Sequence, residues 1–578
     1  MSHKHYTLSR RDFLKTTVVG LGGAVLASCK RNTTISPVTA IPDNTPTVPT
    51  GATANTIFHN GTILTVDSGN SVSQAVAISG NQIMQVGKNE AILALVQPDT
   101  QVIDLAGRVL SPGLIDPHFH LAYLDLLNQM IPFLSPEVKI IADMVAKLKD
   151  VVAQTPKGEW IQIYFMTLEE GRMPTRQELD VVSPDNPVWI IQQGGHLGCS
   201  NSMALQLANI SADTPNPPGG IIERDQNGEP TGLFYNHRAM NVLRSAIPKR
   251  PVSSIQTSII EGQHLLLSSG VTTFHDVYAY GMDVINAYMQ AGKNGEMVVQ
   301  GAVYPVLENP GEVNHPTGLE HYNDPFMRLG GYKLQVDGSA LTAYCHEPTK
   351  GIAWDKPAWP EDDFKKTVRA LHDTGLQICV HCVGDAAVDL TLDAFEEAMN
   401  ANPRPDPRHR IEHCVLTKPN STQRIKDLGV VISNTASFTL MAGDLYVETY
   451  GQERADRLLV AREWLEAGIP MALGTDYPTT PWPQPQMTLA SAIARLTASG
   501  KVLNPKQCLT FEEALRAFTM GSAYAGFEEN IKGSIEPGKL ADMIVWTKDP
   551  RTLDAKELAL TTTVDMTFVG GKLVYPAA

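Results

Sequence analysis

The sequence predicts an α/β fold: a (β/α)8 TIM barrel with an insertion after barrel strand 1 and a composite β-sandwich built from both termini. Three observations predict it. The middle of the chain alternates apolar strand-like runs with helix-like runs, both ends show short alternating strands with Gly and Asn turns, and polar residues recur where the candidate barrel strands end. A chain of 578 residues with 43% hydrophobic residues can form one large domain with appendages.

The eight candidate barrel strands follow one another along the middle of the chain. They cover residues 114–121, 271–276, 298–306, 332–338, 377–383, 409–414, 430–437 and 471–477, with helix-like runs such as 362–374 and 454–468 between them. The gap between the first two strands must hold an insertion at about 123–250. Long insertions at this end of a barrel often serve as lids, so we expect this one to fold over the barrel mouth.

Domain boundaries follow from these patterns. Residues 1–29 are predicted to be a leader, 30–54 a flexible linker rich in Thr, Pro and Asn, and 112–532 the barrel with its insertion. Residues 55–111 and 533–578 are predicted to supply the two parts of the sandwich.

The leader resembles a twin-arginine export signal. Arg10 and Arg11 precede Phe-Leu-Lys and a short apolar run, which ends in Leu-Ala-Ser-Cys29, similar to a bacterial lipoprotein box. The resemblance implies export by the twin-arginine machinery, lipidation of Cys29 and a membrane-anchored protein facing the periplasm. The alternative is an ordinary cleaved signal with an incidental cysteine.

Charge and cysteine usage exclude other classes. The formal net charge of −15 argues against a nucleic-acid partner. Seven cysteines in so long a chain do not form a disulfide framework, and Cys379 and Cys382 lie in an apolar strand-like run, where we interpret them as buried thiols. A homo-oligomer is a candidate state of the chain.

A set of polar residues predicts a metal centre. His118 and His120 are spaced i, i+2 on a strand, which places both imidazoles on one face, where two such groups can hold a metal ion. Alone, each polar residue of this kind is more often structural. Together they recur in strand order at the carboxyl ends of candidate barrel strands, where barrel active sites lie: His118, His120, Lys333, His381, His413 and Asp476.

Four motifs resemble the amidohydrolase superfamily, and its branch similar to N-substituted formamide deformylase, over about residues 55–575. They are Pro-Gly-Leu-Ile-Asp-Pro-His-Phe-His at 112–120, His-Cys-Val-Gly-Asp at 381–385, Arg-Ile-Glu-His at 410–413 and Gly-Thr-Asp at 474–476. The resemblance implies two divalent metal ions, with Zn²⁺ favoured by imidazole and carboxylate ligands. His118, His120 and Asp476 would bind one ion and His381 and His413 the other, and a carbamate on Lys333 would bridge the two.

The resemblance implies a small-molecule substrate. The implied reaction is hydrolysis of a carbon–nitrogen bond other than a peptide bond, in an N-formyl or N-acyl amine or a cyclic amide. Asp476 would take a proton from the attacking water and pass it to the leaving nitrogen. Alternatives stay open: Lys333 paired with Asp337 or another carboxylate beside a single metal, a lactone or ester hydrolase or an isomerase on the same site, and a non-catalytic lipid-anchored binding protein.

Other residues are candidates for the surroundings of the site. His196 lies in a Gly-His-x-x-x-x-Asn-Ser-x-Ala-Leu stretch similar to one near the substrate in the family branch, so we expect it to polarise the substrate carbonyl. Asp337 is expected to bind substrate or to orient a metal ligand. His275 could line the barrel mouth but is interpreted as structural. Glu412 is expected to point to the strand face opposite its neighbour His413 and is also interpreted as structural. Cys382 stands where related sequences usually have a small residue.

Overall fold

The computed structural model describes residues 51–134, 137–165, 168, 171–192, 194–308, 326–349 and 356–576. The predicted leader with Cys29 lies outside the described residues. Within these ranges no helix has both the length and the apolar composition needed to cross a membrane.

Parallel strands form the centre of the molecule, and each of the eight predicted strands has a counterpart. One sheet has the order β17-β16-β15-β8, from β8 (Leu114–Phe119), β15 (Val271–Ala279), β16 (Gln300–Pro305) and β17 (Met327–Leu329). The other has the order β18-β19-β20-β21-β22, from β18 (Gly331–Gln335), β19 (Gln377–Cys382), β20 (Arg410–His413), β21 (Val431–Asn434) and β22 (Met471–Leu473). Every neighbouring pair within these two sheets is parallel.

Backbone contacts join the two sheets at both edges. Val306, just after β16, forms a parallel bridge with Lys333 of β18. At the other edge the Asp476 N–H donates to the His118 carbonyl at 2.8 Å, and the His120 N–H donates to the Tyr477 carbonyl at 2.9 Å. The segments that carry the predicted ligands are therefore held together by the backbone as well as by side chains.

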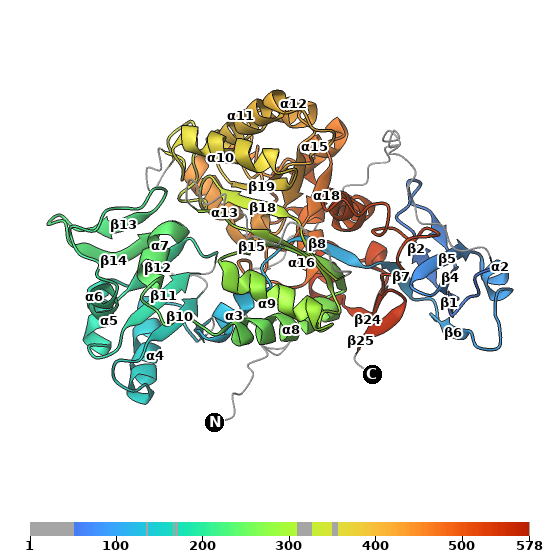
Figure 1. Cartoon of the computed structure of the whole chain (residues 1–578), viewed down its shortest axis with the longest axis horizontal. Helices are drawn as coiled ribbons and strands as arrows, with labels where there is room; N and C mark the ends of the chain where they lie inside the picture. Colours follow the sequence, from blue (N-terminus) through green and yellow to red (C-terminus); the bar gives the residue numbers. More distant parts are fainter. Residues whose placement is uncertain are drawn as a thin grey trace.

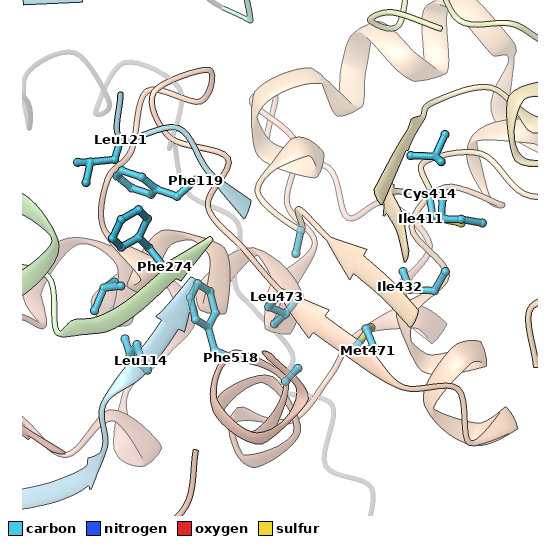
Figure 2. Packing of buried hydrophobic residues seen from close by; sticks show 14 of the residues in the cluster. Leu114, Phe119, Leu121, Phe274, Ile411, Cys414, Ile432, Met471, Leu473 and Phe518 are labelled. Carbon is cyan, nitrogen blue, oxygen red and sulfur yellow. The ribbon is translucent and has the colours of Figure 1, made fainter. Parts of the chain in front are cut away.

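Apolar residues of these strands pack against helices. Figure 2 shows Leu114, Phe119 and Phe274 on one side of this core and Ile432, Met471 and Leu473 on the other, all within one buried cluster. The helices of this part of the chain are α8 (Val252–Ser268), α9 (Met282–Lys293), α10 (Glu361–Asp373), α11 (Asp385–Ala401), α12 (Ser421–Asp427), α13 (Phe438–Tyr450), α14 (Gln452–Ala455), α15 (Ala461–Ala467), α16 (Pro485–Ala494), α17 (Phe511–Arg516) and α18 (Ser522–Ala525).

Helix α10 illustrates why these segments are helical. Its buried Phe364, Val368 and Leu371 recur every three or four residues and make one apolar face. Three acidic residues occupy its first turn, where negative charge complements the unpaired N–H groups of the helix start.

The two ends of the chain meet in one six-stranded sheet of order β25-β24-β23-β7-β2-β3, shown to the right of the centre in Figure 1. It combines β2 (Thr62–Leu64), β3 (Val72–Ser73) and β7 (Val109–Pro112) with β23 (Met543–Trp546), β24 (Val564–Val569) and β25 (Lys572–Tyr575). A second sheet, β5-β4-β1-β6, contains only N-terminal strands: β1 (Thr56–His59), β4 (Ala75–Ser79), β5 (Gln82–Gly87) and β6 (Gln101–Asp104), with α2 (Asn89–Leu93) beside it. The two sheets share a core in which the rings of Phe58 and Phe568 lie 4.9 Å apart.

The insertion is a lobe with a mixed sheet, which the sequence patterns did not predict. Its strand order is β13-β14-β12-β11-β10-β9, and Figure 1 shows it at the left of the parallel strands. Its strands are β9 (Ile131–Phe133), β10 (Ile161–Phe165), β11 (Val188–Gln192), β12 (Leu197–Ser200), β13 (Ile221–Arg224) and β14 (Pro230–Tyr235). Its helices are α3 (Tyr123–Asn128), α4 (Ile141–Gln154), α5 (Arg176–Val182), α6 (Ser202–Leu207) and α7 (Asn236–Arg244). Near the C-terminus, α19 (Ala555–Thr561) lies between β23 and β24 in the chain.

Candidate active site

Three predicted ligands converge at the carboxyl ends of the parallel strands. One ligand atom from each of His118, His413 and Asp476 lies within 4.8 Å of the other two, and all three side chains are buried. The ring of His381 lies 4.7 Å from that of His413, measured between centroids, and His120 Nε2 lies 2.9 Å from Asp476 Oδ1. The structure thus brings the four predicted histidines and the aspartate into one contiguous cluster.

The donor chemistry of this cluster fits a divalent cation. In three histidines one ring nitrogen faces a protein oxygen: His118 Nδ1 lies 2.5 Å from Glu412 Oε2, His413 Nδ1 lies 3.1 Å from Thr435 Oγ1, and His381 Nε2 lies 3.0 Å from the Gly338 carbonyl. The other nitrogen then carries the lone pair that a metal needs, which is the usual arrangement of metal-binding histidines.

Burial also favours the neutral, metal-binding form of these rings. It holds the pKa of His118, His381 and His413 well below the ordinary value of 6.5. A neutral imidazole offers a lone pair, whereas an imidazolium does not.

Two of the ligand positions have a backbone conformation that is rare outside glycine. The φ angle is 66° at His413 and 57° at Asp476, both in the left-handed region. Such strain persists where the surrounding structure imposes it, and it clusters at functional sites. Here it turns both side chains off the ends of their strands toward His118.

Lys333 is buried in β18, and burial lowers its pKa from 10.5. Its ammonium makes no ion pair or hydrogen bond with any residue that the structure describes, so the alternative pairing with Asp337 is absent there. Instead, the Asp337 carboxylate accepts hydrogen bonds from the backbone N–H groups of Tyr344, Val383 and Gly384.

Those contacts hold Asp337 beside His381. Its Oδ1 lies 3.7 Å from His381 Nε2, and burial raises its pKa to about 7. Both carboxylate oxygens are taken up by the segment that follows His381. This favours a role in positioning that histidine over direct contact with a substrate.

Glu412 requires a correction, because the structural role expected for it is incomplete. Besides contacting His118, it accepts hydrogen bonds from Arg410 through both carboxylate oxygens, at 2.8 and 3.1 Å. Burial would raise the pKa of Glu412, but the positive charges of Arg410 and Lys333 hold it below the usual 4.5.

His275, also buried, accepts a hydrogen bond from Arg410 at its Nδ1 and does not line the mouth.

Asp116 is a second supporting residue that sequence reasoning missed. It accepts hydrogen bonds from the N–H and hydroxyl groups of Thr475 and from the N–H of His118. Burial raises its pKa to about 7. The signal was in the sequence, since Asp116 precedes His118 by two positions on the same strand and therefore shares its face.

Three aromatic rings lie beside the cluster, two from the insertion (His196 and His237) and one from β15 (Tyr278). His196 precedes β12, and its ring lies 5.4 Å from that of His381, so the structure places it at the cluster as expected. His237 of α7 lies 4.9 Å from His196 and 5.1 Å from Tyr278, whose ring in turn lies 6.1 Å from His120. No sequence pattern pointed to His237 or Tyr278.

Comparison with known proteins identifies the family of the chain. The amidohydrolase family model matches residues 101–575. The chain belongs to the amidohydrolase family. It is 29% identical over 548 residues to N-substituted formamide deformylase of Arthrobacter pascens, covering 89% of this chain and 97% of that one. It is 28% identical to Protein LONG AFTER FAR-RED 3 of Arabidopsis thaliana, over 92% of this chain and 93% of that one.

A solved structure supports the same fold. An uncharacterized metal-dependent hydrolase from Pyrococcus horikoshii matches with a TM-score of 0.69 at 24% identity, over 87% of this chain and 99% of that one. This amidohydrolase therefore has a TIM-barrel-like α/β fold. It is a hydrolase acting on carbon–nitrogen bonds other than peptide bonds, and its family suggests dependence on a divalent metal.

Proposed function

We propose that this amidohydrolase removes a formyl or other small acyl group from an amine by metal-assisted hydrolysis. The observation that carries the proposal is the convergence of His118, His413 and Asp476 within 4.8 Å inside a family of amide-hydrolysing enzymes. The deformylase name of the Arthrobacter relative supports the choice of N-formyl amines as first substrates, ahead of cyclic amides, lactones and esters.

Two cations would be held by the residues that cluster here. His118, His120 and Asp476 would hold one, His381 and His413 the other, and a carbamate on Lys333 would bridge them. Divalent ions at this position supply Lewis acidity toward a carbonyl oxygen and lower the pKa of a water molecule. The lowered pKa of Lys333 supports the carbamate, because only a neutral amine can add to carbon dioxide.

Asp476 is proposed to move the proton during the reaction. The proposal is supported by the position of its carboxylate among His118, His120 and His413. Asp476 would accept the proton of that water and then donate it to the nitrogen that leaves. His196 would donate a hydrogen bond to the carbonyl oxygen, which gains negative charge as the water attacks.

The architecture and location of the protein complete the proposal. The parallel strands β8, β15, β16 and β18–β22 would close into the (β/α)8 barrel, and the two terminal sheets would form the composite sandwich. Export by the twin-arginine machinery, lipidation of Cys29 and anchoring in the cell envelope facing the periplasm are proposed from the leader.

Metal content and Lys333→Ala test this function. The Zn²⁺-loaded protein should contain about two metals per chain and hydrolyse N-formyl amines, with metal content and kcat both falling in Lys333→Ala. Added ¹³C-bicarbonate should give a carbamate NMR signal in the native protein and none in Lys333→Ala. The matched control is Lys366→Ala, since that lysine is exposed on α10. One metal with full activity in Lys333→Ala would disprove the bridge, and hydrolysis of lactones alone would disprove the substrate class.

A further inference from the structure

His237 is a buried histidine that has no role in the proposed reaction. It is 8% exposed, and its Nδ1 has no hydrogen-bond partner among the described residues. Its ring lies between those of His196 and Tyr278. A buried polar atom without a partner carries a free-energy cost, so its persistence beside an active site points to a partner that arrives with the substrate.

Several contacts of the neighbouring residue Asn236 hold the His237 ring in place. Asn236 has a φ of 65°, which asparagine tolerates better than most residues. Its N–H donates to the His196 carbonyl at 2.7 Å, and its side-chain oxygen accepts from the Thr342 hydroxyl at 3.0 Å. Gly338 leaves the room for this contact, because a Cβ there would overlap both Asn236 Oδ1 and Thr342 Oγ1. His196 and His237 are therefore fixed relative to each other and to the segment after β18.

The surroundings of His237 carry balanced charge. The Tyr278 hydroxyl donates to Glu308 Oε1 at 2.8 Å, and Asn241 donates to the other oxygen of Glu308 at 2.8 Å. Arg244 donates to Asn241 Oδ1 at 3.3 Å, so its positive charge lies near the negative charge of Glu308. Tyr278 has thus already used its donor, and the imidazole N–H groups are the ones left to meet a ligand.

Burial disfavours a positive charge on the ring of His237 and on that of His196. A neutral imidazole has one N–H donor and one acceptor nitrogen. A carboxylate buried against such rings would lack a paired cation, whereas a carbonyl oxygen needs only the single hydrogen bond.

We propose that His237 is a second substrate-binding residue, which donates a hydrogen bond to an uncharged carbonyl oxygen other than the one that is attacked. The preferred substrates are then open-chain amides with a second carbonyl group close to the scissile bond, such as acylated amino-acid amides. This inference rests on the proposed function, since it assigns the first carbonyl to the metal cluster and His196.

Two matched compounds test the assignment on the Zn²⁺-loaded enzyme. N-formylglycinamide has the second carbonyl, and N-formylpropylamine lacks it. In His237→Phe, kcat/KM for N-formylglycinamide should fall about tenfold, the value of one hydrogen bond, with most of the change in KM. The value for N-formylpropylamine should stay within about twofold, and His237→Asn, which keeps an N–H donor, should recover part of the loss.

Other results would overturn the inference. Equal losses on both compounds, with metal content and melting temperature unchanged, would make His237 merely structural, and no loss on either would remove it from the site. Tighter binding of N-formylglycine than of its amide would contradict the choice of an uncharged acceptor.

Calorimetry separates this inference from the proposed function. If the native enzyme hydrolyses neither compound, the proposed function fails, and the binding measurement alone decides the role of His237. About tenfold tighter binding of N-formylglycinamide than of N-formylpropylamine, lost in His237→Phe, supports the role. Equal binding of the two compounds refutes it.

Discussion

Replacing Glu412 by alanine should destabilise the protein far more than any surface substitution. Glu412 and Arg410 are both fully buried and joined by two hydrogen bonds, so the substitution leaves a guanidinium without its counter-charge in the protein interior. Arg410 keeps its bonds to the Pro117 carbonyl, His275 and Ser433, but none of these groups carries a negative charge.

The expected cost follows from this geometry. Removing one partner of a buried ion pair costs about 3–5 kcal/mol. Glu412→Gln removes the charge and one acceptor but keeps one oxygen that can take the place of Oε2, which faces both His118 and Arg410, so it should cost less, about 1–3 kcal/mol. Arg369→Ala is the control, because it removes an exposed ion pair to Asp373 on α10 and should cost under about 1 kcal/mol.

Urea unfolding followed by circular dichroism measures all three variants, with metal affinity as a second readout. His118 should bind metal about 10- to 100-fold more weakly once Glu412 no longer orients its ring. The reasoning is refuted if Glu412→Ala costs no more than Arg369→Ala, or if Glu412→Gln is as damaging as Glu412→Ala.

Two further predictions concern other buried groups. His409 accepts from the Ile378 N–H and contacts His372 at 2.8 Å, and burial holds its pKa well below 6.5. The unfolded chain therefore binds a proton as pH falls below 6.5 and the folded chain does not, so stability should fall by up to about 1.4 kcal/mol per pH unit through this residue. Urea midpoints at pH 7, 6 and 5 should show a shallower dependence in His409→Gln, and an unchanged slope would exclude His409 as a source. Gly338→Ala should displace Asn236, which we expect to raise KM for N-formylglycinamide at constant metal content, whereas an unchanged KM would show that the loop absorbs the added methyl group.

The sequence predicted the parallel strands, and it predicted which polar side chains lie together at the strand ends, for one physical reason. A buried parallel strand is a short apolar run, and a polar residue at its end is visible against that background, as with His118, His381 and Asp476. The placement of a residue within a strand was less reliable. Alternation put Glu412 on the face opposite His413, but the left-handed backbone at His413 ends the alternation, so both residues reach His118.

The insertion shows what sequence reasoning could not reach. Its strands are three to six residues long, and they pair with partners of both directions, so no single periodicity marks them. His237 of α7 and Tyr278 of β15 come together through a ring contact between segments that are far apart in the chain. Spacing along the sequence carries no signal for such pairs.

The sheet shared by the two ends of the chain has a consequence for biosynthesis. Strand β7 pairs with β23, and Arg108 forms an ion pair with Asp565, 457 positions later. A ribosome must therefore release almost the entire chain before β7 can pair with β23, and until then β7 presents an open edge to other nascent chains. Contacts between residues so far apart in the sequence slow folding. We therefore expect this protein to depend on chaperones that cover the unpaired edge of β7 while the C-terminal strands are synthesised.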